Sequence, residues 1–179
     1  MWIRDELPKH EMGVRTVIYG YKTQLVDSKS FQRIPDLAQD LINRLQAYGW
    51  GFSWAKPITF LTHRLGGIIL EEALVQCATA VSSGNRQQNL LNSVKGAIFF
   101  GTPTLGMEQE HFHTVVQRGP MEALVDDLAI NSTYLRCLNE RFFETPLLSS
   151  LKCFWAYELH ESHTIQVCYP TYKSAIYSY

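Results

Sequence analysis

The segment from Phe60 to Gly67 contains the residues whose types and order come closest to a catalytic motif. A short apolar run enters a turn there, and a helical pattern follows directly. A strand-to-helix turn of this kind holds its central side chain above the end of the strand, where a serine can attack an acyl carbon. In this chain the central residue is Arg64. A guanidinium stays charged and offers no hydroxyl, so the sequence predicts a nucleophile position without a nucleophile.

The other residues of this turn have expected roles of their own. In the pattern G-x-S-x-G, glycines stand two residues before and two residues after the serine. Thr62 replaces the first glycine, whereas Gly66 matches the second. We expect the backbone N–H of Leu65 to be one donor of an oxyanion hole. His63 is expected to pack under the turn, and Gly67 lets the helix approach the strand.

The elements that would position this turn alternate along the chain. β-rich runs indicate strands over residues 14–19, 57–62, 94–100, 151–157 and 164–169. Helical spacing indicates helices over residues 34–48, 68–80, 109–117, 120–129 and 132–142. Pro35 suits the first turn of the first of these helices, and Gly49 suits its C-terminal cap. This alternation predicts an α/β fold, a mostly parallel sheet with helices on both faces.

Four segments in a defined order carry a family resemblance that covers nearly the whole chain. They are Trp2–Pro8, Tyr19–Tyr21, His63–Gly67 and Gly96–Pro103, with a weaker fifth match at residues 173–176. Together they resemble the lipase-like serine-esterase domain of fungal NACHT and ankyrin-repeat proteins. They are also similar to the mitochondrial serine active site containing protein. The resemblance implies a partial α/β-hydrolase fold, a single truncated domain over residues 1–179 that lacks the first strands and the C-terminal end.

The resemblance also implies where the rest of a catalytic triad would lie. Its pattern G-H-S-L-G-G departs from this chain at Thr62 and Arg64. Its acid corresponds to Glu158, for which an exposed strand-end glutamate is an equally open interpretation. Its histidine would follow residues 173–175, and no histidine follows them in this sequence. We expect His160 and His163 to be loop residues.

Composition narrows the partners and cofactors. The 179 residues are 46% hydrophobic with a formal net charge of -1, which is typical of a globular domain and does not favour nucleic acid. No apolar run reaches the ~20 residues of a transmembrane helix. His111 and His113 lack further ligands at metal-site spacing, so we expect no metal and no cofactor.

Cysteine usage bears on the compartment. The four cysteines are widely spaced, and no signal peptide pattern is present, so we expect reduced core thiols and an intracellular protein. They are Cys77, Cys137, Cys153 and Cys168. The cytoplasm is the expected location, and the resemblance leaves the mitochondrion and the endoplasmic reticulum open.

Two functions stay open at this point. The first is a catalytically inactive lipase-like domain or pseudoenzyme, either an interaction module or a gene remnant. Protein partners, self-association through an exposed sheet edge, and an acyl or lipid ligand would all fit it. The alternative is a serine esterase or lipase that hydrolyses acyl esters. That alternative needs another nucleophile, and Ser53, Ser82 and Ser83 do not lie in a strand-to-helix turn.

Overall fold

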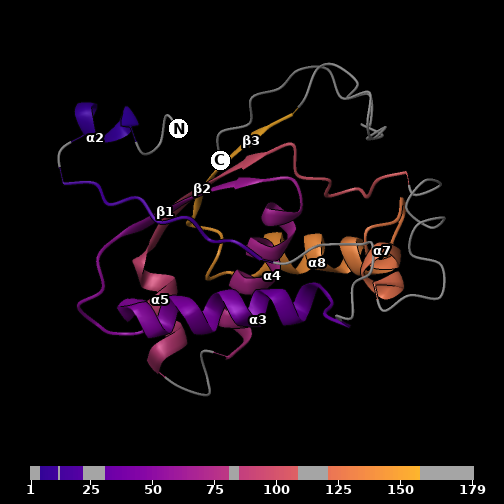
Figure 1. Cartoon of the computed structure of the whole chain (residues 1–179). Coiled ribbons are helices and arrows are strands. Elements are labelled where there is room, and N and C mark those ends of the chain that lie inside the picture. Colours follow the sequence, from indigo (N-terminus) through magenta and orange to yellow (C-terminus); the bar gives the residue numbers. More distant parts are fainter. Residues whose placement is uncertain (1–4, 12, 22–30, 81–84, 109–120, 158–179) are drawn as a thin grey trace.

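A parallel sheet forms the centre of this protein. The computed structural model describes residues 5–11, 13–21, 31–80, 85–108 and 121–157. Within them the sheet has three strands in the order β1-β2-β3 (Figure 1). The strands are β1 (Ile58–His63), β2 (Val94–Phe100) and β3 (Lys152–Ala156). Both pairings are parallel, so all the carboxyl ends lie at one edge of the sheet. The α/β class and three of the predicted strands are confirmed.

Helices connect and cover the strands. They are α2 (Leu7–His10), α3 (Ile34–Leu45), α4 (Leu65–Thr79), α5 (Asn85–Ser93), α7 (Glu122–Asp127) and α8 (Thr133–Glu144). A π-helical turn, η1 (Gln46–Trp50), extends α3 and contains Gly49 at φ 105°. Four predicted helices are confirmed with shifted ends, because α3, α4, α7 and α8 overlap the expected segments and differ from them by at most three residues at either end.

Local sequence explains where the best-defined helices begin. In α3, Pro35 stands in the first turn, and the Asp36 carboxylate accepts a hydrogen bond of 2.9 Å from the backbone N–H of Arg33. In α8, the hydroxyl of Ser132 accepts the backbone N–H of Leu135 at 3.4 Å. Both are N-terminal caps, which satisfy N–H groups that have no partner within the helix.

Two expectations about the elements were wrong. Residues 14–19 form no strand, and Val17 and Ile18 are 59% and 71% exposed. β-branched residues favour a strand only where a neighbouring strand supplies the ladder, and none of the described strands pairs with this segment. Helix α5 was not predicted, because it contributes only Leu90 and Ser93 to the buried interior and has little apolar periodicity. The predicted helix over 109–117 and strand over 164–169 lie outside the described residues.

One face of the sheet packs on helices, and no helix among the described residues covers the other face (Figure 1). The inner rows Phe60–Ala97–Cys153 and Thr62–Phe99–Trp155 are buried or half-buried against α4 and its neighbours. The outer row Leu61–Ile98–Phe154 includes Leu61 at 40% and Phe154 at 46% exposure. In the part of the chain that the structure describes, α3, α4, α5 and α8 lie on one side of the sheet (Figure 1). The helical layer predicted for the second face is not found among these residues.

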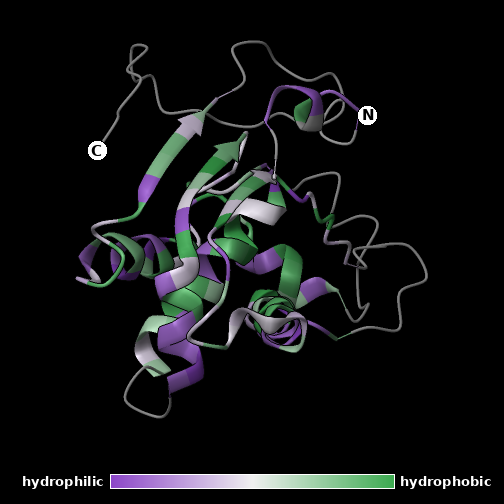
Figure 2. Cartoon of the chain, turned by 90° about the vertical axis from the view of Figure 1, so that its left-hand side faces the viewer, coloured by the Kyte–Doolittle hydropathy of each residue, from purple (hydrophilic) through white to green (hydrophobic). Residues whose placement is uncertain are grey.

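Helix α4 is the centre of the core. It contacts α3, α5, α8 and β1, and ten of its residues are buried. Figure 2 shows hydrophobic residues concentrated where α4 meets the sheet and hydrophilic residues on the outer helices. A helix that is covered on all sides must be apolar around its circumference, as the sequence of α4 predicted.

The first turn of α4 packs against the end of β2 without space for a side chain. A Cβ atom on Gly67 would lie 2.1 Å from the hydroxyl oxygen of Thr102 and 2.5 Å from its methyl group. Because Thr102 is itself buried, neither side can move away easily. Glycine at this position is therefore a requirement of the packing, although it is a poor helix former.

We predict that Gly67→Ala lowers the free energy of unfolding by about 1–3 kcal/mol through overpacking, although alanine normally stabilises a helix. Gly20→Ala is the matched control, since nothing lies within 4 Å of its added Cβ, and it should change stability by less than about 0.5 kcal/mol. Urea denaturation measures both. Thr102→Ala removes the two nearest atoms and should partly restore the Gly67→Ala variant. Equal stability of Gly67→Ala and wild type would contradict the close contact.

Candidate functional site

The turn between β1 and α4 has the backbone geometry of a strained strand-to-helix elbow. Strand β1 ends at His63, α4 starts at Leu65, and Arg64 between them has φ 51° and ψ −123°. These angles resemble the first central position of a type II′ turn, where glycine is usual. A non-glycine residue there costs about 1–3 kcal/mol, which the surrounding structure must offset.

Backbone hydrogen bonds fix Arg64 on both sides. Its N–H donates to the carbonyl of Phe100 at 2.9 Å, which continues the β1–β2 ladder up to the turn. Its carbonyl accepts the N–H of Gly67 at 2.9 Å, which closes the first helical turn. Beside it, the N–H of Gly101 donates to the carbonyl of Ala156 at 2.8 Å. The ends of all three strands therefore hold this turn in place.

The flanking residues take different positions around the turn. Thr62 points to the inner face, where its hydroxyl donates to the carbonyl of Ile98 at 3.1 Å. His63 is exposed on the outer face, in register with Phe100, so the expectation that it packs under the turn was wrong. Side chains alternate along a strand, and the half-buried Thr62 occupies the inner position. A Cβ on Gly66 would meet only the hydroxyl of Tyr21, at 3.4 Å.

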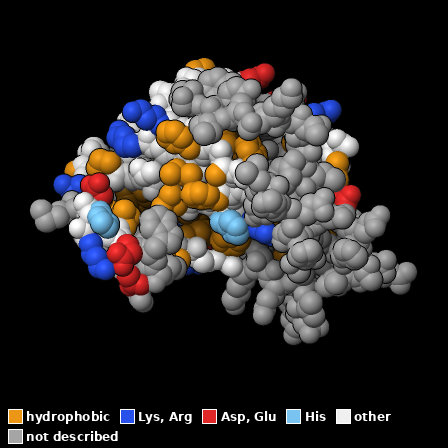
Figure 3. Space-filling view, turned by 90° about the horizontal axis from the view of Figure 1, so that it is seen from above, with side chains coloured by type: hydrophobic (Ala, Val, Ile, Leu, Met, Phe, Trp, Pro, Cys, Tyr) orange, Lys and Arg blue, Asp and Glu red, His pale blue; other side chains and the backbone are white. Residues whose placement is uncertain are grey.

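Leu65 begins α4, and its side chain packs partly against the core. The first N–H groups of a helix have no partner within the helix and point toward its N-terminal end. The backbone N–H of Leu65 can therefore donate a hydrogen bond to an anion above the turn. Figure 3 looks down on the side where the strands end and shows hydrophobic side chains gathered beside a histidine.

The predicted acid and histidines lie outside the described residues. Glu158, His160 and His163 follow Tyr157, the last described residue, and His111 and His113 lie in another segment that is not described. Within the described part, no group of three or more His, Cys, Asp or Glu side chains could hold a metal. No helix in that part is long and apolar enough to cross a membrane.

The cysteines only partly fit the expected core thiols. Cys77, Cys137 and Cys153 are free thiols; Cys77 is buried, Cys153 is half-buried and Cys137 is exposed on α8. Burial raises the pKa of Cys77 to about 12. Placing Cys137 in the core was wrong, because the apolar face of α8 passes through Leu135, Leu138 and Phe142 instead. Cys168 lies outside the described residues.

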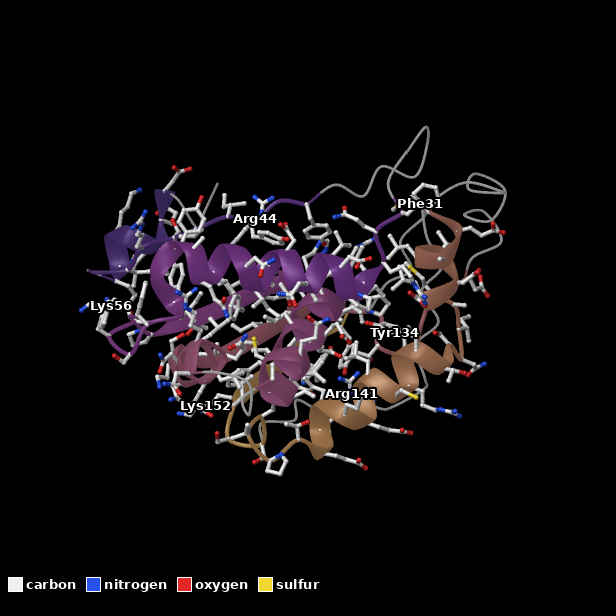
Figure 4. The ribbon with its side chains drawn as sticks, turned by 90° about the horizontal axis from the view of Figure 1, so that it is seen from below. Phe31, Arg44, Lys56, Tyr134, Arg141 and Lys152 are labelled. Atoms are coloured by element: carbon white, nitrogen blue, oxygen red, sulfur yellow. The ribbon has the colours of Figure 1, made fainter. Side chains whose placement is uncertain are left out.

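Two adjacent buried carboxyl groups, about two helical turns below the elbow, were not predicted from the sequence. Glu72 accepts hydrogen bonds from the hydroxyl of Tyr134 at 3.0 Å and from the Gln76 side chain at 2.8 Å. Tyr134 extends from α8 toward the interior (Figure 4), where burial and Glu72 raise its pKa. The signal was present in the sequence, since Glu71 and Glu72 stand side by side in an otherwise apolar helix.

Glu71 is the less satisfied of the two carboxyl groups. It is 1% exposed, and its Oε1 has no hydrogen-bond partner. Burial raises its pKa to about 8, so it is largely neutral at physiological pH. It follows Gly67 by four residues, so both lie on the same face of α4, beneath the elbow. Burial, and to a smaller extent Glu71, raises the pKa of Cys153 and of Tyr157.

Comparisons with known proteins identify a similar fold. No protein-family profile matches the chain, and no curated protein matches its sequence. The crystal structure of the Bacillus licheniformis lipase BlEst2 in mature form matches 69% of this chain and 47% of that chain, with 17% identity and a TM-score of 0.45. Its propeptide form matches 69% of this chain and 26% of that chain, with 17% identity and a TM-score of 0.47. The match thus spans about half of the mature lipase or less, and the likeness concerns the fold alone.

We predict that Glu71 makes stability fall with pH in the neutral range. Its pKa in the folded chain, about 8, lies above the ordinary value of 4.5, so the folded chain binds this proton more tightly than the unfolded chain. The contribution of the neutral carboxyl to the free energy of unfolding is therefore fully present below about pH 4.5. It is lost as the pH rises toward about 8. The expected loss is on the order of a few kcal/mol. Cys153, with a pKa raised to about 11, stays protonated in this window.

Glu71→Gln should remove this slope and stabilise the chain at pH 8 relative to wild type. Denaturant unfolding at pH 5 and pH 8 measures the difference. Glu140→Gln is the matched control, because Glu140 is exposed on α8. If wild type and Glu71→Gln lose stability in parallel between the two pH values, the buried neutral carboxyl is refuted.

Proposed function

We propose that this chain is a lipase-like α/β domain that does not hydrolyse esters and that acts as a binding or interaction module. Its order of motifs resembles the lipase-like domain of fungal NACHT and ankyrin-repeat proteins, which supports a place next to signalling or repeat modules. The parallel three-stranded sheet and the elbow after β1 support the relation to lipases at the level of architecture. The proposal concerns residues 1–179 as one domain.

The observation that carries the proposal is Arg64 at the tip of the elbow. The backbone there has the strained geometry that a serine nucleophile requires, but the side chain is a guanidinium. Arginine is not deprotonated in proteins and cannot form an acyl ester. Its positive charge also stands at the N-terminus of α4, where the helix dipole already favours an anion. This arrangement supports binding of an anionic or polar group rather than covalent attack on it.

Neighbouring hydroxyl groups do not replace the missing serine. Thr62 donates its hydroxyl to a carbonyl on the inner face, and Thr102 is buried against Gly67. Ser53 is exposed between η1 and β1, on the far side of that strand from the elbow. A nucleophile needs a base within hydrogen-bond reach and an oxyanion donor beside it, and none of these hydroxyls is placed next to Leu65.

Hydrolysis of acyl esters is the second candidate. The retained elbow geometry favours it, because strain at a functional turn usually persists only where it serves a site. It would require a serine outside the described residues to act with an acid such as Glu158. Reaction with an active-site probe and turnover of an ester substrate distinguish the two candidate functions.

We predict that the purified chain neither reacts with a fluorophosphonate probe nor hydrolyses p-nitrophenyl butyrate above the buffer rate. The combined change Arg64→Ser and Thr62→Gly restores the G-x-S-x-G pattern, yet we expect turnover to stay at background, because triad residues act as a unit. Ser53→Ala is the control for probe reaction at an unrelated exposed serine. Stoichiometric labelling of a serine in the unmodified chain would overturn the proposal. Strong activity of the repaired variant would mean that His160 or His163 serves as the base.

A further inference from the structure

A second candidate site lies on the open face of the sheet, away from the elbow. A hollow of about 550 Å³ occupies the amino-terminal half of the strands. The described residues that line it include Thr59, Lys95, Gly96, Ser150, Lys152 and Phe154. Gly96 precedes Phe100, whose carbonyl binds the elbow, by four residues, so the two sites are separated by about 13 Å along the strand.

The floor of the hollow is flat because the central strand has no side chain there. Gly96 lies in the outer row between Thr59 and Lys152. A Cβ on Gly96 would stand 2.9 Å from the carbonyl oxygen of Lys152, so β3 approaches too closely for any other residue. A glycine inside a strand often marks a place where another group can approach the backbone. Gly96 itself is buried, so the central strand contributes no side chain between the exposed Thr59 and Lys152.

The rim of the hollow is positively charged. Among the described residues that line it, Lys95 and Lys152 are charged and none is an aspartate or glutamate. The ammonium of Lys95 already donates to the carbonyl of Asn92 at 2.7 Å. The ammonium group of Lys152 makes no hydrogen bond or ion pair within the part of the chain that the structure describes. The residue lies at the margin of the molecule, apart from Tyr134 and Arg141 (Figure 4). One ammonium group is therefore available for one negative charge.

The upper wall of the hollow is apolar. Ile98 and Phe154 are neighbours in the next outer row, and the Phe154 ring is 46% exposed. Aromatic rings prefer offset-stacked or edge-to-face contacts with other rings. A planar ring can lie against the exposed ring of Phe154 more closely than a branched aliphatic group can.

We propose that this hollow binds a small aromatic carboxylate. Its carboxylate would pair with Lys152, with the hydroxyls of Thr59 and Ser150 as further donors. Its ring would lie against Phe154, which is two residues from Lys152 on the same face of β3. The single available ammonium favours a monoanion over a phosphate monoester, which carries nearly two charges. This site does not depend on Arg64 or on the proposed loss of catalysis.

The test uses 2-naphthoate and the full chain, with binding followed by isothermal titration calorimetry. We expect saturable binding with one site, and Lys152→Gln should weaken it about tenfold, which is a typical effect of one charge-assisted hydrogen bond. The neutral isostere 2-naphthamide should bind weakly and equally to wild type and Lys152→Gln. Phe154→Ala should weaken 2-naphthoate and 2-naphthamide by the same factor, because it removes the ring contact and not the charge.

Arg136→Gln is the matched control for the loss of one positive charge, since Arg136 is exposed on α8. It should leave the affinity for 2-naphthoate unchanged. The proposal is overturned if 2-naphthoate shows no saturable binding, or if Lys152→Gln binds it as tightly as wild type. An equal loss in Arg136→Gln and Lys152→Gln would also overturn it, because the effect would then come from net charge alone.

Discussion

The contact between Gly67 and Thr102 is the constraint on which the rest of this structure depends. It brings the first turn of α4 against the end of β2, so the chain must reverse direction in a single residue after β1. That residue is Arg64, and the reversal places it at φ 51°. Packing in the core thus dictates the backbone conformation at the surface turn. The strain at this turn therefore has a cause in the packing, whatever side chain the turn presents.

Helix α4 also places two carboxyl groups in the core, where burial disfavours their charged forms. α4 is surrounded by α3, α5, α8 and the sheet, and two adjacent carboxyl groups are buried within it. Glu72 is satisfied by Tyr134 and Gln76, whereas Glu71 remains neutral because burial raises its pKa to about 8. A buried carboxyl group destabilises the folded chain less when it keeps its proton. Because Glu71 belongs to α4, the protonation state of this buried carboxyl affects the helix that begins at the elbow.

The sequence predicted the parts of the fold whose signals are local. Strand β2 was predicted over its observed range, and α3 and α8 were found from Pro35 and the Ser132 cap. The parallel sheet and the glycine-dependent turn after β1 followed from the alternation of elements. The strand expected at residues 14–19 failed because β-propensity needs a pairing partner that sequence does not reveal. The outward position of His63 and the hollow over Gly96 depend on sheet register, which only the structure defines.

A guanidinium, not a hydroxyl, stands at the tip of this elbow, and we propose that no acyl-enzyme forms there. The decisive measurement is intact-mass spectrometry after incubation of the chain with excess p-nitrophenyl acetate at neutral pH, followed by acid quench. We expect no serine-linked acyl adduct in peptide maps of the treated chain. A stoichiometric mass increase of one acetyl group, mapped to a serine, would contradict it.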